Sequence, residues 1–561
     1  MFIRVKHNGA YDYLQLVSSE RIDGKVCQRV IGTLGRKDVL ERSEILDGLL
    51  ASLGKFTRHA AVLADHRSGK TEVLSTASIG PGLVFGRLWE QLGLPEVLEE
   101  RLAGRKFEFA VERAVFLTVL HRLLAGGPRS DRAAEKWRAD YRLAGVGELD
   151  LQHLYRAMAW LGEELPTGQQ AWATPFSPRC TKDVIEEALF ARRRDLFTDL
   201  SLAFFDTTSL YFEGEGGETL GERGHNKDHR PDLRQMVVGM VLSGEGRPVC
   251  SEMWPGNTTD VKTLLPVVDR LVKRFGIGRV CVVADRGMIS RDTVANLEDN
   301  PAGLSYILGA RLRSTSEVRD TVLSWGGSYH EVQGPRQHSK SPSPLKVKDI
   351  RFTGEDGRER RYVVCHNEEQ AAKDRADREA ILASLEDQLK RGDKSLVGNK
   401  GYRRYIKSEG KHWSVDRAKV QAEARYDGKW VLRTNRFDCE AAEIALRYKE
   451  LWMVEAIFRA TKSVLVTRPI YHKCDETIRG HVFCSFLALT LMKELEDRLS
   501  AKGHELEWAN VLADLEALRV VKLRSGAATC ELRTTPQGVA GKVVQAAGVA
   551  LGPTLRFLEE A

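Results

Sequence analysis

The stretch LSLAFFDTTSLYF, residues 200–212, decides the fold of this chain. Its apolar run, rich in Phe and Leu, predicts a buried strand that ends in one carboxylate, Asp206. An acid in such a position is costly unless a partner or a cation compensates its charge. Asp206 could instead cap an ordinary turn after the strand, and the stretch alone leaves both interpretations open.

A second strand and a helix repeat the pattern. The run VCVVADRG ends near Asp285, and Glu455 lies in a helix that we predict over residues 438–463. Three acids at the ends or faces of core elements are typical of a metal site. The helix spacing places four residues on one face, and apolar neighbours such as Trp452 predict that this helix is largely buried; the four are Tyr448, Leu451, Glu455 and Lys462.

The order of elements between residues 201 and 309 predicts the architecture. Three antiparallel strands are followed by a helix, a strand, a shorter helix and another strand, which is the order of an RNase H-like core. A right-handed crossover would place the strand of Asp285 parallel to the strand of Asp206, with both acids at one sheet edge. We therefore expect an α/β fold with a mixed five-stranded sheet, helices, and a β-rich insertion domain that interrupts this core.

The rest of the chain divides into further expected domains. Asn-Gly and Asp-Gly turns predict an N-terminal β-meander, whose basic side chains fit an ordinary solvated sheet face as well as DNA contact. The expected ranges are a β-rich module at 1–80, a helical domain at 81–175 for which DNA binding is one hypothesis, the core at 176–310 and 438–503, the insertion at 311–437, and a C-terminal helix-hairpin-helix region at 504–561.

Residues 399–413, NKGYRRYIKSEGKHW, interleave basic and aromatic side chains. Basic residues hold phosphates and aromatic rings stack on unpaired bases, so this pattern favours nucleic-acid contact over a merely solvated hairpin. The candidates here are Arg403, Arg404, Lys407 and Trp413.

The glycine-rich loop at 213–232 permits two interpretations. His225, Asp228 and His229, with Cys250, could suggest zinc, but no fourth ligand follows at a recognised spacing. We expect instead that the basic residues of this loop approach DNA beside Asp206; they are Arg223, His225, Lys227 and Arg230.

Charge and cysteine content bound the class of protein. A formal net charge of +7 over 561 residues permits nucleic-acid binding but is too weak a field to establish it. Nine cysteines without a C-x-x-C pair predict a reduced, cytoplasmic chain with no disulfide framework or zinc ribbon. We expect no signal segment and no membrane span, because no apolar run is long enough to cross a bilayer.

These motifs resemble those of bacterial insertion-sequence DDE transposases, in the group with the signature Y-x2-R-x3-E-x6-K. The signature falls on Tyr448, Glu455 and Lys462, with Leu451 where Arg is usual. Further stretches within residues 175–500 are similar to family motifs, as is the N-terminal β segment; they are FFDTTSLYFEGEG, MWPGNTTD, ADRGMIS, YILGARLR and RPIYH…IRGH.

The resemblance implies phosphoryl transfer on DNA, with cutting at terminal inverted repeats and joining of the 3′ ends to target DNA. Asp206, Asp285 and Glu455 would be the catalytic acids and would hold two Mg²⁺ ions, for which Mn²⁺ can substitute. The implied partner besides DNA is a second copy of the chain, as a homodimer in a synaptic complex, and no small-molecule substrate is expected. The implied DNA-binding residues are Tyr448, Lys462, Arg286, Arg311 and Arg313.

The resemblance also implies that the insertion domain clamps a flipped base or a hairpin intermediate. Trp325, Trp413 and Trp430 are its candidate aromatic residues.

Two other functions fit the same residues. One is a catalytically inactive, transposase-derived DNA-binding regulator, against which the presence of three acids argues. The other is a structure-selective nuclease on an RNase H-like fold. A requirement for specific DNA ends, and joining as well as cutting, would separate a transposase from such a nuclease.

Overall fold

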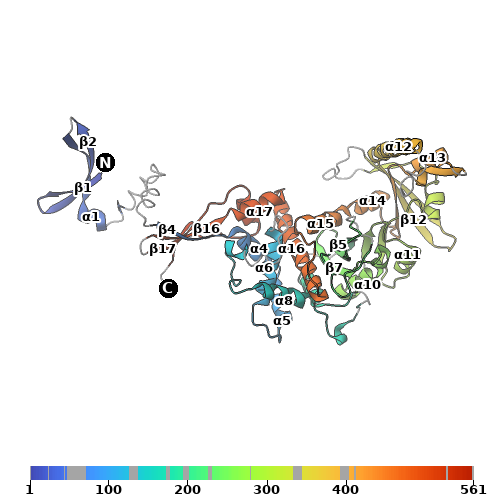
Figure 1. Cartoon of the computed structure of the whole chain (residues 1–561), viewed down its shortest axis with the longest axis horizontal. Helices are drawn as coiled ribbons and strands as arrows, with labels where there is room; N and C mark the ends of the chain where they lie inside the picture. Colours follow the sequence, from blue (N-terminus) through green and yellow to red (C-terminus); the bar gives the residue numbers. More distant parts are fainter. Residues whose placement is uncertain are drawn as a thin grey trace. The chain divides into compact units, whose positions relative to one another are not determined.

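The computed structural model divides the chain into two compact units (Figure 1). Unit 1 comprises residues 1–77, 519–535 and 552–561, and unit 2 comprises residues 78–518 and 536–551. The structure describes all residues except 1, 23–24, 43–44, 47–70, 125–136, 172, 174–176, 194–200, 225–229, 278–279, 333–343, 392–402, 410–411, 526–527 and 559–561.

Unit 1 contains two antiparallel sheets. The first is the expected meander β1-β2-β3, in which the Asn8-Gly9 turn has a positive φ of 61° at Gly9. The second has the order β18-β17-β16-β4, so a strand near residue 75 joins the C-terminal hairpin that the sequence predicted. The bounds are β1 Phe2–Asn8, β2 Tyr11–Ile22, β3 Lys25–Arg36, α1 Lys37–Arg42, β4 Thr71–Ser78, β16 Arg519–Ser525, β17 Ala528–Arg533 and β18 Leu555–Leu558.

Unit 2 combines a group of helices with a large sheet, and α16 contacts both. This long helix, Asp475–Ala501, packs against α6 and α8 and also against β7. None of the helices within the described ranges is long and apolar enough to cross a membrane. The other helices of this group are α4 Gly80–Gln91, α5 Leu94–Leu102, α6 Val111–Leu124, α8 Leu151–Gly162, α9 Thr181–Arg192, α17 Trp508–Glu516 and α18 Ala540–Ala546.

The large sheet has nine strands in the order β10-β11-β12-β15-β9-β8-β5-β6-β7. β5, β6 and β7 are antiparallel to one another, whereas β8 runs parallel to both β5 and β9. Helices α10 and α11 make the two crossovers, so these five strands follow the predicted order. Their bounds are β5 Leu202–Tyr211, β6 Gln235–Ser243, β7 Pro248–Pro255, α10 Leu264–Phe275, β8 Cys281–Ala284, α11 Arg291–Glu298 and β9 Ser305–Gly309.

The prediction that the sheet stops at five strands was wrong. Strand β15 pairs antiparallel with β9, and β12, β11 and β10 extend the same sheet beyond it. An unpaired β9 would expose a row of backbone N–H and C=O groups, and the inserted strands satisfy them. The inserted elements are β10 His330–Val332, β11 Leu345–Thr353, β12 Glu359–His366, α12 Glu368–Arg391, β13 Ile406–Glu409, β14 His412–Val415, α13 Arg417–Ala424 and β15 Lys429–Thr434.

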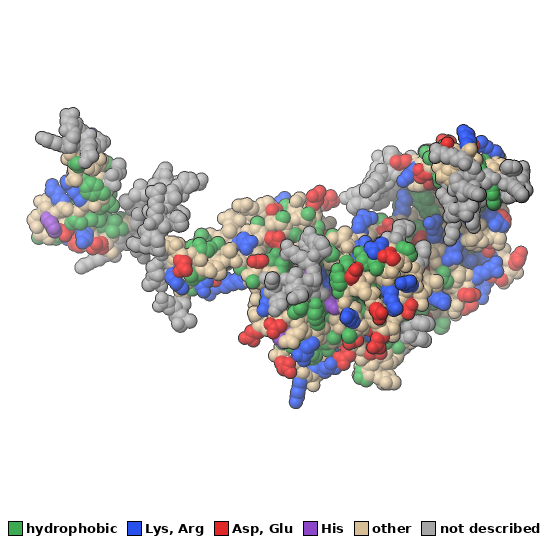
Figure 2. All heavy atoms as spheres, viewed as in Figure 1, with side chains coloured by type: hydrophobic (Ala, Val, Ile, Leu, Met, Phe, Trp, Pro, Cys, Tyr) green, Lys and Arg blue, Asp and Glu red, His purple; other side chains and the backbone are tan. Residues whose placement is uncertain are grey.

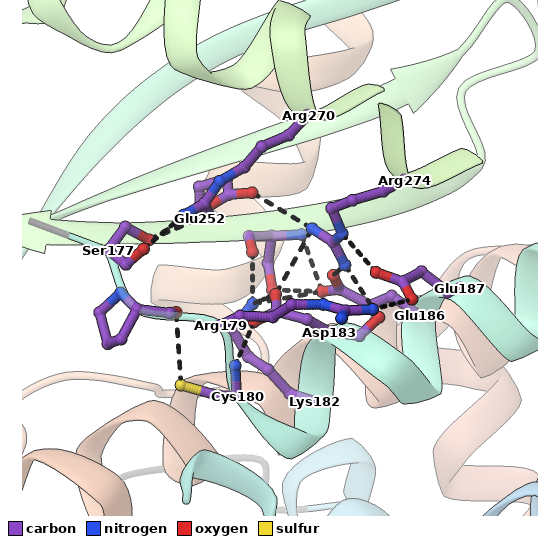
Figure 3. A network of polar contacts seen from close by, with 12 residues as sticks. Ser177, Arg179, Cys180, Lys182, Asp183, Glu186, Glu187, Glu252, Arg270 and Arg274 are labelled. Atoms are coloured by element: carbon purple, nitrogen blue, oxygen red, sulfur yellow. Dashed lines mark hydrogen bonds and ion pairs between the residues drawn. The ribbon is translucent and has the colours of Figure 1, made fainter. Parts of the chain in front are cut away.

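A network of buried charges joins α9 and α10 next to β7, as Figure 3 shows. At its centre is the Arg274 guanidinium, whose side chain is 2% exposed. Four carboxylates surround it, at N–O distances of 2.7 Å for Glu187, 3.0 Å for Glu186, 3.3 Å for Glu252 and 3.4 Å for Asp183.

Burial and the neighbouring cations act in opposite directions on the pKa values of Asp183 and Glu186. Burial raises the pKa of Asp183, but Lys182 and Arg274 outweigh that effect and hold the pKa below its ordinary value. Burial raises the pKa of Glu186, and the same cations only partly oppose it. Because buried carboxylates without a cation are costly, the packing of α10 against α9 depends on Arg274.

We predict that Arg274→Ala lowers the free energy of unfolding by about 3–5 kcal/mol, because the change leaves buried carboxylates without their cation. The control is Arg358→Ala, which removes a pair of ion contacts to Glu298 and Asp299 from a side chain that is 46% exposed. The control is expected to cost less than about 1 kcal/mol. Urea unfolding of both variants measures the difference, and equal midpoints would contradict this view of the network.

Candidate active site

Asp206 lies inside β5, which continues to Tyr211, and not at the end of a strand as the sequence predicted. Alternate side chains of β5 enter different cores. Ala203 and Phe205 pack in the core shared with α10, whereas Leu210 and Phe212 pack in a core that includes residues of α16. Asp206 therefore faces the side of the sheet on which α15 and α16 lie.

Asp285 directly follows β8 and lies on the same side. Ala284 pairs with Phe205 in the parallel ladder, so the next residues along both strands, Asp206 and Asp285, are neighbours. Val282 and Ala284 pack in the α10 core, which turns Asp285 toward the opposite face. The register places the two acids side by side, as predicted, but only Asp285 lies at the end of its strand.

The predicted helix over residues 438–463 is two helices, α14 Ala441–Lys449 and α15 Trp452–Ser463. Between them the N–H of Leu451 bonds the carbonyl of Tyr448 at 3.2 Å, and the N–H of Val454 bonds the carbonyl of Leu451 at 3.0 Å. These bonds span three residues, which tightens the turn between the two helices. α14 packs against β8 and β9, and α15 packs against β5 and β6.

Tyr448 is bonded to one of the acids. Its hydroxyl donates to Oδ1 of Asp285 at 2.8 Å. Burial raises the pKa of the Tyr448 phenol, and the charge of Asp285 and this hydrogen bond raise it further. The phenol therefore remains a donor at neutral pH. Gly309 makes room for the ring, because a Cβ at this position would collide with the Tyr448 hydroxyl and with the backbone nitrogen of Arg286.

Glu455 is exposed on the face of α15 that also carries Trp452 and Arg459. The three residues are spaced by three and four, so they form one stripe along the helix. Trp452 is 48% exposed, which corrects the prediction that it lies in a buried face. Lys462, in the last turn of α15, is partly buried.

The predicted arginines differ in their surroundings. Arg286 is exposed next to Asp285, and Arg311 donates to the carbonyls of Arg286 and Gly287 at 3.2 and 3.1 Å. Arg311 thus braces the turn that follows Asp285. Arg313 pairs with Glu423 at 2.9 Å and lies over the Tyr426 ring, so part of its charge is compensated within the protein.

The predicted residues of the insertion fall on two surfaces of the hairpin β13–β14. Lys407 pairs with Ser414 and Ser408 pairs with Trp413, so Lys407 and Trp413 point to opposite faces. Arg404 is exposed beside them, and the side chain of Arg403 lies outside the described residues. On the face drawn in Figure 2, basic and acidic side chains are interspersed across unit 2.

The other tryptophans of the insertion differ in exposure. Trp325 is 42% exposed and stacks on Phe352 with ring centroids 5.6 Å apart, whereas Trp430 is partly buried in β15.

The loop that raised the zinc alternative is described except for residues 225–229, which include His225, Lys227, Asp228 and His229. Cys250 is described; it is a residue of β7 and packs in the core shared with α10, where burial raises the pKa of its thiol well above the ordinary value. A thiol held protonated in an apolar core is a poor zinc ligand, because zinc binds the thiolate.

Among the residues that the structure describes, no group of three or more His, Cys, Asp or Glu side chains is arranged to hold a metal ion. The acids nevertheless supply the right chemistry, since carboxylate oxygens are the donors that Mg²⁺ and Mn²⁺ prefer. Two acids are strand neighbours and the third comes from a helix that packs on β5. Without a cation, like charges on such groups repel, which opposes a closed arrangement.

Two residues beside Asp206, namely Asp260 and Thr207, were not among the predicted site residues. The Thr207 hydroxyl donates to Oδ1 of Asp260 at 2.7 Å, and the Thr207 N–H donates to Oδ1 of Asp206 at 2.7 Å. Asp260 is the last residue of the motif MWPGNTTD, and this motif was the signal available in the sequence.

Two family models match the chain. The model described as the transposase DDE domain matches residues 198–491, and the model described as the IS1634 family transposase N-terminal domain matches residues 3–64. No curated protein matches. A solved structure, the piggyBac transposase synaptic complex with hairpin DNA, is similar at 10% identity over 78% of this chain and 79% of that chain. Its TM-score is 0.36, and nothing about this chain is inferred from it.

We predict that Gly309→Ala destabilises the protein by about 1–3 kcal/mol, because the added methyl forces the Tyr448 ring away from Asp285. In a Tyr448→Phe background the same change should cost less, because the hydroxyl that meets the methyl is absent. Gly326→Ala is the control, since its Cβ would meet no atom within 4 Å. Thermal unfolding of these variants tests the contact, and an equal cost of Gly309→Ala in both backgrounds would exclude it.

Proposed function

Because this chain belongs to the DDE transposases of insertion sequences, we propose that Asp206, Asp285 and Glu455 are its catalytic acids. The chain is a DNA transposase, and DDE transposases in general depend on divalent metal ions. The observation that carries the assignment is the parallel register of β5 and β8, which makes Asp206 and Asp285 neighbours on the face where α15 packs. The strand order β7-β6-β5-β8-β9 supports an RNase H-like core around them.

The proposed ions are two Mg²⁺ per active site, with Mn²⁺ as a substitute. Mg²⁺ retains several waters and often binds through one or two carboxylates together with substrate phosphates, so the three acids are a sufficient protein contribution. When bound, such a pair of ions activates the attacking oxygen and stabilises the leaving oxygen. The DNA phosphate itself would complete the site.

The protein's own groups have separate roles in this proposal. Tyr448 fixes one rotamer of Asp285 by donating to it, which leaves the other carboxylate oxygen for a ligand. Arg286 lies exposed beside Asp285 and would contact a phosphate of the cut strand. Arg311 acts through the backbone carbonyls that it holds, which keeps the turn after Asp285 in place.

We propose that the stripe of α15 faces the DNA. Trp452 exposes much of its ring one turn before Glu455, and Arg459 is exposed one turn after it. An exposed aromatic ring stacks on an unpaired base and a guanidinium holds a phosphate, so the stripe would guide a strand past the catalytic acid. Lys462 would hold a phosphate further along, and the insertion would supply Arg404, Lys407 and an aromatic residue such as Trp325 or Trp413.

The proposed reaction is cutting at the terminal inverted repeats of the insertion sequence and joining of the 3′ ends to target DNA. Two ends must be brought together for joining, so a homodimer in a synaptic complex is the proposed assembly. A plasmid that carries the DNA flanking the chain's own gene is the substrate that tests this. Breaks at the repeat ends, dependent on Mg²⁺ and absent with EDTA, support the proposal, whereas breaks without end specificity favour a nuclease.

We predict that Asp206→Asn, Asp285→Asn and Glu455→Gln each lower the rate of strand cleavage about a thousandfold. Each carboxylate lost removes several kcal/mol of charge stabilisation from the transition state. Binding to the repeat ends should remain within about threefold of the wild type, because each change is nearly isosteric. Single-turnover cleavage and gel-shift titration measure the two effects.

The control for these variants is Asp292→Asn, in the first turn of α11, which should cut at the wild-type rate. Normal cleavage by any one of the three acid variants would remove that acid from the active site. Loss of end binding together with cleavage would show a structural defect instead.

We predict that Trp452→Ala weakens binding to end DNA about tenfold, because stacking on a base contributes about 1–3 kcal/mol. Trp452→Phe should recover most of the affinity, since it retains an aromatic face. Fluorescence anisotropy with a labelled repeat end measures both, with thermal unfolding as the check on folding. Wild-type affinity of Trp452→Ala would mean that this stripe of α15 does not face the bound strand.

A further inference from the structure

Asp260 lies where the chain leaves β7 and enters α10. Its backbone carbonyl accepts from the N–H of Thr263 at 3.1 Å and from the Thr263 hydroxyl at 2.7 Å. Thr263 is fully buried, and α10 begins at the next residue. The buried charges in Figure 3 anchor this helix through Arg270 and Arg274. The backbone of Asp260 is therefore held by a rigid part of the fold.

The side chain of Asp260 reaches the strand of the first catalytic acid. Its Oδ1 accepts from the Thr207 hydroxyl at 2.7 Å, and Thr207 is 2% exposed. A buried hydroxyl without an acceptor would be costly, which makes this bond a strong constraint on β5. Asp206 precedes Thr207, and its Oδ1 accepts from the Thr207 N–H at 2.7 Å. Any displacement of Thr207 therefore moves the group that orients Asp206.

The other oxygen of Asp260 reaches the turn of the second catalytic acid. A Cβ placed on Gly287 would lie 3.3 Å from Oδ2 of Asp260, so this carboxylate packs closely against the turn two residues after Asp285. The N–H of Met288 bonds the carbonyl of Asp285 at 3.0 Å, which closes the same turn. Arg311 holds its carbonyls, so Asp260 and Arg311 both restrain the turn.

We propose that Asp260 is a positioning residue that sets the spacing between Asp206 and Asp285, and through it the affinity of the site for divalent metal ions. Asp260 acts through Thr207 and through the turn at Gly287, and it is not itself a ligand. The proposal rests on the assignment of Asp206 and Asp285 as metal ligands. In this proposal, metal affinity depends on the acceptor oxygen of residue 260 and not on the negative charge of that residue.

The test compares Asp260→Ala, Thr207→Val and Asp260→Asn in the full chain. Mn²⁺ binding, followed by the loss of the free-ion electron paramagnetic resonance signal, is measured without DNA. Cleavage of end DNA is measured as a function of Mg²⁺ concentration. Removing a group that orients a metal ligand typically costs 10–100-fold in metal affinity or activity, so Asp260→Ala and Thr207→Val should weaken Mn²⁺ binding at least about tenfold.

Asp260→Asn should bind Mn²⁺ within about threefold of the wild type, because the amide oxygen still accepts from Thr207. The double variant Thr207→Val/Asp260→Ala should be no worse than its worse single change, since both remove one bond. Two measurements, a gel shift with end DNA and thermal unfolding, identify any variant that fails to fold. If Asp260→Ala fails to fold, the comparison is made between Asp260→Asn, Thr207→Val and the wild type.

Three results would overturn the proposal. Wild-type Mn²⁺ affinity of Asp260→Ala means that Asp260 positions nothing. Equal losses in Asp260→Asn and Asp260→Ala mean that the charge itself acts. Multiplying losses in the double variant mean that Thr207 and Asp260 act separately. Asp285→Asn tests separately whether Asp285 is a metal ligand. If this variant binds Mn²⁺ like the wild type, Asp285 does not belong to the metal site, and the assignment fails independently of the role of Asp260.

Discussion

The parallel pairing of β5 with β8 is the constraint on which the proposed active site depends. Phe205 opposite Ala284 is the last pair of this ladder, and each is followed by a carboxylate. A shift of one residue in either strand would turn one acid into the apolar core around α10, where a carboxylate is too costly to bury. The apolar core on the α10 side of the sheet thus sets the strand register that places Asp206 and Asp285 on the other side.

Acids brought together in this way oppose folding unless something else offsets their repulsion. The structure spreads that cost over neighbouring groups. Tyr448 donates to Asp285, the Thr207 N–H donates to Asp206, and Arg311 holds the turn between strand and helix. Glu455 is exposed on α15, where water screens its charge, so this carboxylate adds little repulsion in the protein alone. In the proposed site, metal ions and the DNA phosphate would complete the arrangement that these contacts begin.

The order of strands and the proximity of Asp206 and Asp285 could be predicted, because alternation of apolar residues and right-handed crossovers leave few topologies. Three features could not. The break between α14 and α15 depends on a tightened turn at Leu451. No Gly or Pro occurs in this stretch, so the sequence contains no local signal for the break. The exposure of Trp452 depends on which side of α15 meets the sheet. The sheet continues into the insertion because β9 offers an open edge, which is a long-range effect that local periodicity does not record.

The central claim is that one metal site is formed by β5, the end of β8 and α15, and iron-directed cleavage of the polypeptide tests it most directly. Fe²⁺ bound in place of Mg²⁺, with ascorbate and peroxide, produces hydroxyl radicals that cut the backbone near the ion. We expect cuts close to Asp206, Asp285 and Glu455 in the complex with end DNA, and we expect excess Mg²⁺ to suppress them. Cuts confined to other segments, or cuts that Mg²⁺ does not suppress, would contradict it.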